Sequence, residues 1–214
     1  METDNKKSRD RHLTERKILD ALGDIIKEEG FENVKVNSVS QRAGVSKMLI
    51  YRYFGNMDEL IAKYILEKDY WINITADEFD IRQIGPFIKK VFRDRIAQLR
   101  EDVTMRRLHR WELTGNHAVI NQLREKRESN GYRLVEMVSR LTDSPHREVA
   151  ALATIISASI SYLTLLEEPS VVYNGIHLQS DEGWEQIARG IDLIIDLWMQ
   201  KQEQESDRVK DTLL

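Results

Sequence analysis

A run of eighteen residues without a formal charge, from Val149 to Leu166, constrains the fold of this chain more than any other feature. Its length reaches the threshold for a membrane-spanning helix. However, five of its residues are Ser or Thr, and the acidic residues Glu167 and Glu168 follow it directly. We therefore expect no membrane span, but a helix buried within a soluble protein. A helix that is apolar on every side needs cover on every side.

The rest of the chain is also rich in helical signals. Only three Pro and ten Gly interrupt its 214 residues, and apolar residues recur at three- and four-residue spacing, most regularly from Trp184 to Trp198. No segment alternates like a half-buried strand, and Pro169 to Asp181 is expected to be a loop. The sequence therefore predicts an all-α protein. After a polar segment at residues 1–12, helices are expected from about Leu13, between Val36 and Gly44, between Ser46 and Phe54, from about Asp58, and near 85–100, 104–114, 117–141, 146–167 and 182–201.

The composition argues against several classes of function. The chain has no cysteine, which excludes disulfides, thiolate zinc sites and thiol nucleophiles, and which fits a cytoplasmic location. It has no glycine-rich phosphate loop, nucleophile elbow or carboxylate dyad, so we expect neither an enzyme nor a cofactor. His109 and Glu112 are spaced to share a metal, but Arg106, Arg107 and Arg110 nearby disfavour a cation. A surface ion-pair network without a metal is the better prediction.

Charge is distributed unevenly along the chain, although the formal net charge is only −4. Through Asn56 there are eleven Lys and Arg against nine Asp and Glu, whereas the remainder holds 21 against 27. The bias is modest, but its direction suits a DNA-binding head on an acidic body.

The segment from Gly30 to Leu60 has the dimensions of a helix-turn-helix. Its two short helices meet at Gly44, and Ser40 provides the small side chain needed where they cross. The hydroxyl of Ser46 can accept a hydrogen bond from the third amide of the second helix. This helix should bury its apolar residues and expose cations and hydroxyls, which phosphate contacts require. The exposed residues are Ser46, Lys47, Tyr51, Arg52 and Tyr53, with Arg42 just before the turn. An ordinary helical hairpin with solvated charges is the alternative interpretation.

This region resembles the TetR family of transcriptional regulators. The resemblance rests on three runs, Ala43-Gly44-Val45-Ser46-Lys47, Tyr51-Arg52-Tyr53-Phe54 and Asp58-Glu59-Leu60, within about a quarter of the chain. It implies a subunit of about nine helices, with an N-terminal three-helix helix-turn-helix DNA-binding domain and a helical ligand-binding and dimerisation domain. It also implies a homodimer whose recognition helices enter successive major grooves of a palindromic double-stranded DNA operator.

The sequence departs from the family pattern at positions that would face DNA. Lys35 stands where Thr is frequent, Met48-Leu49 replace Gly-Thr, and Met57 replaces Lys. Lys35 can supply a phosphate contact, and Met48 or Leu49 can pack against a thymine methyl group. The predicted DNA-binding residues are therefore Lys35, Arg42, Ser46, Lys47, Met48, Tyr51, Arg52 and Tyr53.

The resemblance also implies how the chain divides. A DNA-binding domain is expected at 1–57, a ligand-binding and dimerisation domain at 58–202, and a polar tail at 203–214. The helices near 146–167 and 182–201 of two copies would form a four-helix bundle, whereas a monomer core that buries both helices is the alternative. Aromatic residues on the middle helices, where the family keeps its pocket, are the candidate ligand contacts: Trp71, Phe92, Trp111, Tyr132 and Tyr162.

The sequence thus predicts a DNA-binding transcriptional regulator, a repressor released by a small, largely apolar ligand. The alternative is a helical protein-interaction or ligand-binding module that has lost DNA binding. The apolar residues Met48, Leu49 and Met57, at positions that would face DNA, favour it. Salt-sensitive DNA binding separates the two, because phosphate contacts release counterions.

Overall fold

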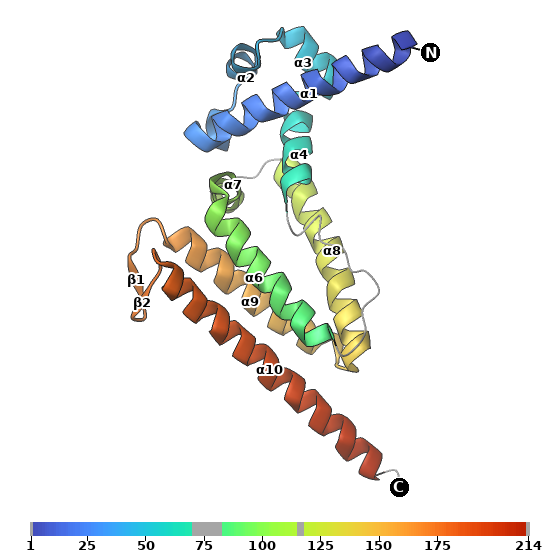
Figure 1. Ribbon diagram of the computed structural model, residues 1–214, viewed down its shortest axis with the longest axis vertical. Coiled ribbons are helices and arrows are strands. Elements are labelled where there is room, and N and C mark those ends of the chain that lie inside the picture. The colour runs from blue at the N-terminus through green and yellow to red at the C-terminus, as the bar shows by residue number, and fades with distance from the viewer. Residues whose placement is uncertain (1, 70–82, 115–117, 213–214) are drawn as a thin grey trace. The chain divides into compact units, whose positions relative to one another are not determined.

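The computed structural model describes residues 2–69, 83–114 and 118–212. Within these ranges it contains nine α-helices and one short two-stranded sheet, so the predicted all-α class is confirmed (Figure 1). The first part of the chain forms α1 (Glu2–Glu29), the 3-10 turn η1 (Phe31–Asn33), α2 (Val36–Ala43), α3 (Lys47–Phe54) and α4 (Met57–Lys68). The second part forms α6 (Ile84–Glu101), α7 (Val103–Thr114), α8 (Ala118–Thr142), α9 (His146–Leu166), β1 (Val172–Tyr173), β2 (Ile176–His177) and α10 (Asp181–Thr212).

The two terminal helices are longer than predicted. Helix α1 begins at Glu2 rather than near Leu13, and α10 continues to Thr212 through the predicted polar tail. Neither extension contains Gly or Pro, which would break a helix. The first has four Lys and Arg residues, and the second has two Glu and two Gln, which favour helix without needing burial. Side-chain pairs one turn apart add support, as where Arg11 Nε donates to Glu15 Oε1 at 2.8 Å.

The expected loop after α9 contains a hairpin that the sequence analysis missed. Strands β1 and β2 pair antiparallel, with Val172 opposite His177 and Tyr173 opposite Ile176. The turn residues Asn174 and Gly175 both have positive φ, 51° and 83°. This is the turn that Asn-Gly favours, because its twist matches that of the two strands.

Contacts divide the chain into two compact units, Met1–Asn73 with Val103–Arg127 and Ile74–Asp102 with Glu128–Leu214. Helix α8 therefore contributes residues to both. The predicted domains, 1–57 and 58–202, are a functional division and remain predictions.

The first unit is built on the apolar stripe of α1. Helices α2, α4 and α7 pack against it. At Gly23 the approach of α4 is close, since a Cβ atom there would lie 2.8 Å from the hydroxyl of Tyr64. The most deeply buried side chains of this core are at most 1% exposed, and they include Ile18, Leu22, Ile25, Ile26, Ile50, Leu60, Ile65, Met105 and Leu108.

In the second unit, α6 packs against both α9 and α10 (Figure 1). A ladder of ion pairs fixes the antiparallel register of α6 and α10. Lys89 pairs with Asp196 at 2.5 Å, and Arg93 pairs with Asp192 at 2.6 Å and with Glu185 at 2.9 Å. The apolar core of this unit includes Ile84, Val138 and Val149, with Phe87, Leu141, Trp198 and Met199 packed around them.

Helix α9 is less covered than predicted. Among the described residues it is the one helix with the length and composition to cross a membrane, and only 22% of its most apolar window is buried. Residues 149–166 were expected to be buried on all sides. Within one subunit, most of this segment is instead exposed or only partly buried.

Candidate DNA-binding site

The turn between α2 and α3 has the geometry predicted for a helix-turn-helix. Gly44 ends α2 in the left-handed conformation, with φ 66° and ψ 34°, which a residue without a Cβ adopts freely. The hydroxyl of Ser40 donates to the carbonyl oxygen of Val45 at 2.6 Å, and the amide of Val45 donates to the carbonyl oxygen of Ser40 at 3.1 Å. This reciprocal pair holds α3 at a fixed angle to α2.

Helix α3 has one buried and one exposed face. Ser46 caps it, because its side chain accepts from the amide of Leu49 at 3.2 Å. Ile50 and Phe54 are buried against the rest of the unit. The opposite face exposes Met48, whose side chain is 79% exposed, together with the predicted residues Ser46, Lys47, Tyr51 and Arg52.

The two predicted residues at the ends of α2 differ in their contacts. Lys35 is the exposed residue that precedes α2, and its side chain makes no cap hydrogen bond there. The guanidinium of Arg42 donates twice to the carboxylate of Glu28 on α1, at 2.8 and 2.7 Å. These hydrogen bonds, with the charge of Glu28, raise the pKa of Arg42 above its ordinary value. Two of the five N–H donors of Arg42 are thus held by Glu28, whose carboxylate would compete with a DNA phosphate for this guanidinium.

Two cations contact the ring of Tyr53. The guanidinium carbons of Arg11 and Arg52 each lie 5.2 Å from the centroid of its ring, within the range of cation–π contacts. Arg52 belongs to α3, whereas Arg11 comes from α1. The sequence analysis missed Arg11 because it placed the start of α1 near Leu13, although the Arg11–Glu15 spacing was a signal of helix.

The predicted ligand contacts do not gather at one described site. Trp71 lies outside the described residues. The ring of Trp111 stacks on Phe31, Phe92 is buried in α6, and Tyr132 and Tyr162 are each 55% exposed. Tyr132 contacts the ring of His146, and Tyr162 contacts that of Tyr173. Their binding of a ligand stays a prediction.

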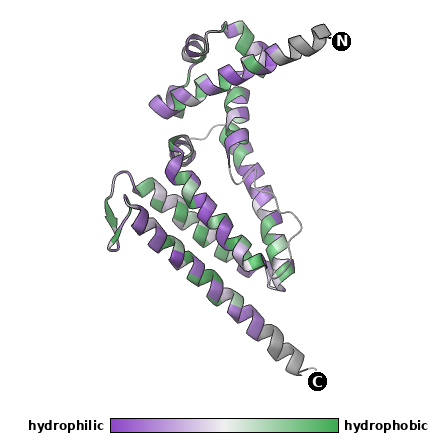
Figure 2. Ribbon diagram, viewed as in Figure 1, coloured by the Kyte–Doolittle hydropathy of each residue, from purple (hydrophilic) through white to green (hydrophobic). Residues whose placement is uncertain are grey.

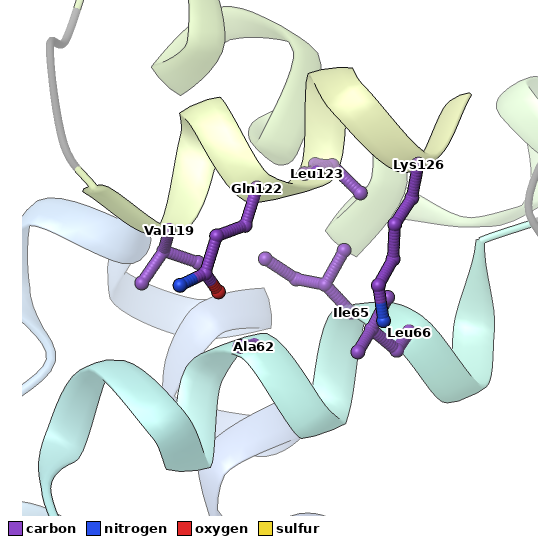
Figure 3. A pocket seen from close by; sticks show the side chains of 7 residues that line it. All are labelled: Ala62, Ile65, Leu66, Val119, Gln122, Leu123 and Lys126. Carbon is purple, nitrogen blue, oxygen red and sulfur yellow. The ribbon is translucent and has the colours of Figure 1, made fainter. Parts of the chain in front are cut away.

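A small open pocket with a cavity volume of about 20 Å³ lies between α4 and the start of α8 (Figure 3). None of the predicted ligand residues lines it. The lining is mainly aliphatic, with Gln122 and Lys126 as its polar members. The remaining lining residues are Ala62, Ile65, Leu66, Val119 and Leu123.

His109 and Glu112 belong to an ion-pair network that is buried rather than on the surface as predicted. Nδ1 of His109 lies 3.4 Å from one Glu112 oxygen, and Arg127 donates to the other at 2.6 Å. Arg127 also pairs with Asp69, which is fully buried at the end of α4. Burial disfavours the Glu112 carboxylate, but the hydrogen bond from His109 and the nearby cations hold its pKa below the ordinary value.

Comparison with protein families places the helix-turn-helix in a known group. Residues 18–64 match the family described as bacterial regulatory proteins, tetR family. The matched range contains the end of α1, all of α2 and α3, and most of α4. No curated protein matches the chain.

Solved structures share the fold along most of the chain. A transcriptional regulator from Rhodococcus sp. Rha1 is 18% identical with a TM-score of 0.59, and the match covers 87% of this chain and 96% of that one. A TetR transcriptional regulator from Agrobacterium tumefaciens is 17% identical with a TM-score of 0.58, covering 85% and 92%. A fatty acid degradation regulator from Bacillus halodurans is 17% identical with a TM-score of 0.57, covering 85% and 93%.

Proposed function

The amino-terminal region of this chain is that of the tetR family of bacterial regulatory proteins, and from this premise we propose that the protein is a sequence-specific DNA-binding repressor. The observation that carries the proposal is the exposed face of α3. Met48 and Tyr51 project from it beside Lys47 and Arg52, while Ile50 on the other face is completely buried. Cations and hydroxyls bind phosphates, and the apolar Met48 side chain suits a thymine methyl group.

The exposed apolar residues of the second unit support a homodimer. Ile155 on α9 is 68% exposed, and Leu193 and Leu197 on α10 are 58% and 56% exposed. Large aliphatic side chains gathered on two helices favour a second copy as their cover, because a two-fold interface uses the same surface on both subunits. Such a dimer would present two α3 helices to a palindromic operator.

A small, largely apolar ligand would release the operator. The fatty acid degradation regulator that shares the fold supports this class of ligand. The α4–α8 pocket has a suitable aliphatic lining, but its cavity of about 20 Å³ has room for about one water molecule and would have to widen to admit such a ligand. Lys126 at the pocket would suit an anionic head group. The protein has one conformation that binds DNA and one that does not. The ligand releases DNA only if its affinity is higher for the conformation that does not bind DNA.

DNA binding should be tested with the purified protein and fragments from its own genomic neighbourhood, at two salt concentrations. We expect tight binding to one palindromic fragment, weakened by salt. The double variant Tyr51→Ala/Arg52→Ala should weaken it at least about thirtyfold, from about 1–3 kcal/mol for each lost contact. The control Arg133→Ala/Arg140→Ala removes two cations from exposed positions of α8 and should leave binding unchanged.

The second candidate is a protein-interaction module without DNA binding. Its support is the same Met48, a large apolar side chain left exposed on α3. Failure of a folded dimer to bind any fragment at low salt would favour this candidate and refute the repressor.

A further inference from the structure

The β1–β2 hairpin is anchored firmly on the start of α10. Leu178, which follows β2, is completely buried, and its carbonyl oxygen accepts a hydrogen bond from the indole of Trp184 at 2.7 Å. Ser180 caps α10 by accepting from the amide of Gly183 at 3.0 Å. Gly183 lets the strand come close, because a Cβ atom there would lie 1.9 Å from the carbonyl oxygen of His177. The hairpin is therefore an ordered element that packs against the start of α10 in its own unit.

The hairpin presents apolar side chains to solvent. Val171, Val172 and Tyr173 are 54%, 45% and 40% exposed, and Figure 2 colours β1 as hydrophobic. No formal charge occurs from residue 169 to residue 180, in a chain of which 32% is charged. A rigid, uncharged and apolar projection is unusual for a connection on a protein surface, which ordinarily carries polar residues.

This apolar surface continues onto α9. The ring of Tyr173 meets that of Tyr162 edge to face, with the centroids 6.2 Å apart. Tyr162 is itself 55% exposed, and it lies on the same helix as the exposed Ile155. The hairpin and α9 thus form one surface.

We propose that the hairpin is an arm of the dimer interface, which packs Val172 and Tyr173 onto a second copy of this chain. The inference rests on the homodimer in the proposed function and extends the interface beyond α9 and α10. A second copy offers the apolar, uncharged surface of α9 that such an arm needs. Acidic residues border the hairpin on both sides, Glu167 and Glu168 before it and Asp181 and Glu182 after it. Arg100 pairs with both Glu167 and Asp181, so these acids do not by themselves select the occupant. The continuity of the hairpin with the exposed face of α9, through Tyr173 and Tyr162, points to a second copy.

The absence of cysteine gives a direct test. In the variant Val172→Cys the single thiol reports the exposure of the hairpin through its rate of reaction with a maleimide. Lys90→Cys is the control, at a side chain on α6 that is 71% exposed. The monomer reference is Val172→Cys combined with Ile155→Asp and Leu193→Asp. Dilution of the Val172→Cys protein below its dissociation constant gives a second monomer reference, should the triple variant fail to fold. Sedimentation measures the oligomeric state of every sample.

We expect the thiol at position 172 to react at least about tenfold more slowly in the dimer than in either monomer reference, and the control thiol to react equally fast in all samples. Equal rates at position 172 in dimer and monomer would overturn the arm and leave the dimer standing. A wild-type chain that sediments as a monomer at all concentrations would overturn the arm together with the proposed dimer. The DNA titration with the Tyr51→Ala/Arg52→Ala variant reports on the regulator independently of both results.

Discussion

The indole of Trp111 on α7 lies flat against the ring of Phe31 in η1, with the ring centroids 4.9 Å apart and the planes 9° from parallel. Next to this stack, the guanidinium of Arg107 donates to the carbonyl oxygen of Ile26 near the end of α1, at 3.1 Å. Both contacts lie within the first unit, and both join α7 to the segment that leads into the helix-turn-helix.

Replacing Trp111 should therefore destabilise the first unit. We expect Trp111→Ala to lower the free energy of unfolding by about 2–4 kcal/mol, because a half-buried aromatic residue loses both its packing and its stacking partner. Trp111→Phe should lose less than about 1.5 kcal/mol, since a ring remains to stack on Phe31. Urea denaturation followed by circular dichroism measures both. Equal losses in the two variants would show that stacking contributes nothing.

The buried carboxylate of Glu112 should make stability depend on pH in the acid range. Its pKa in the folded chain lies below the ordinary value of 4.5, so the unfolded chain binds a proton at a higher pH than the folded chain does. The stabilisation is complete above pH 4.5 and is lost as the pH falls through the folded pKa. Wild-type stability should fall more steeply below pH 4.5 than that of Glu112→Gln. Glu125→Gln, at an exposed position of the same unit, should follow the wild type.

The pair between Arg42 and Glu28 should restrain DNA binding. If Arg42 contacts a phosphate, Glu28→Gln releases its guanidinium and should tighten operator binding by up to about fivefold, the range of an exposed ion pair. Arg42→Ala should lower the slope of log affinity against log salt by about one, the value of one phosphate contact. Glu32→Gln removes the same charge from an exposed position nearby and controls for net charge. If Glu28→Gln and Glu32→Gln increase the affinity for DNA equally, the effect comes from net charge and not from the Arg42–Glu28 pair.

Gly183 should tolerate no side chain. Gly183→Ala brings a Cβ atom against the carbonyl oxygen of His177, so the hairpin or α10 must shift, at a cost of about 1–3 kcal/mol of unfolding free energy. Gly131→Ala in α8 meets no atom within 4 Å and should instead stabilise the chain by up to about 1 kcal/mol, the difference in helix propensity. Chemical denaturation compares the two. A neutral Gly183→Ala would mean that the hairpin is not held in contact with α10.

The sequence was most informative where structure is decided locally. The turn at Gly44 and the cap at Ser46 lie two residues apart, and each has its predicted geometry. Ser40 was predicted only as a small residue, and its hydrogen bond to Val45 was not foreseen. The Asn174-Gly175 hairpin is equally local. It was missed because its strands have two residues each, too few to show alternation.

Features that depend on distant parts of the chain were not predicted. Trp111 stacks on a residue eighty positions away, so its aromatic character alone could not distinguish a ligand contact from a packing contact. Arg42 and Glu28 are fourteen positions apart and become partners only once α2 crosses α1. Burial of the network around Glu112 depends on where Arg127 and Asp69 come together.

The uncovered state of α9 has a consequence for the life of the protein in a cell. As long as nothing covers Ile155 and its neighbours, a newly made subunit presents the surface that chaperones and proteases recognise. Association with a second subunit would bury this surface, and the stability of the protein would then depend on its concentration. Scarce copies would be degraded quickly and abundant copies would persist, so the amount of the protein would rise more than in proportion to its rate of synthesis.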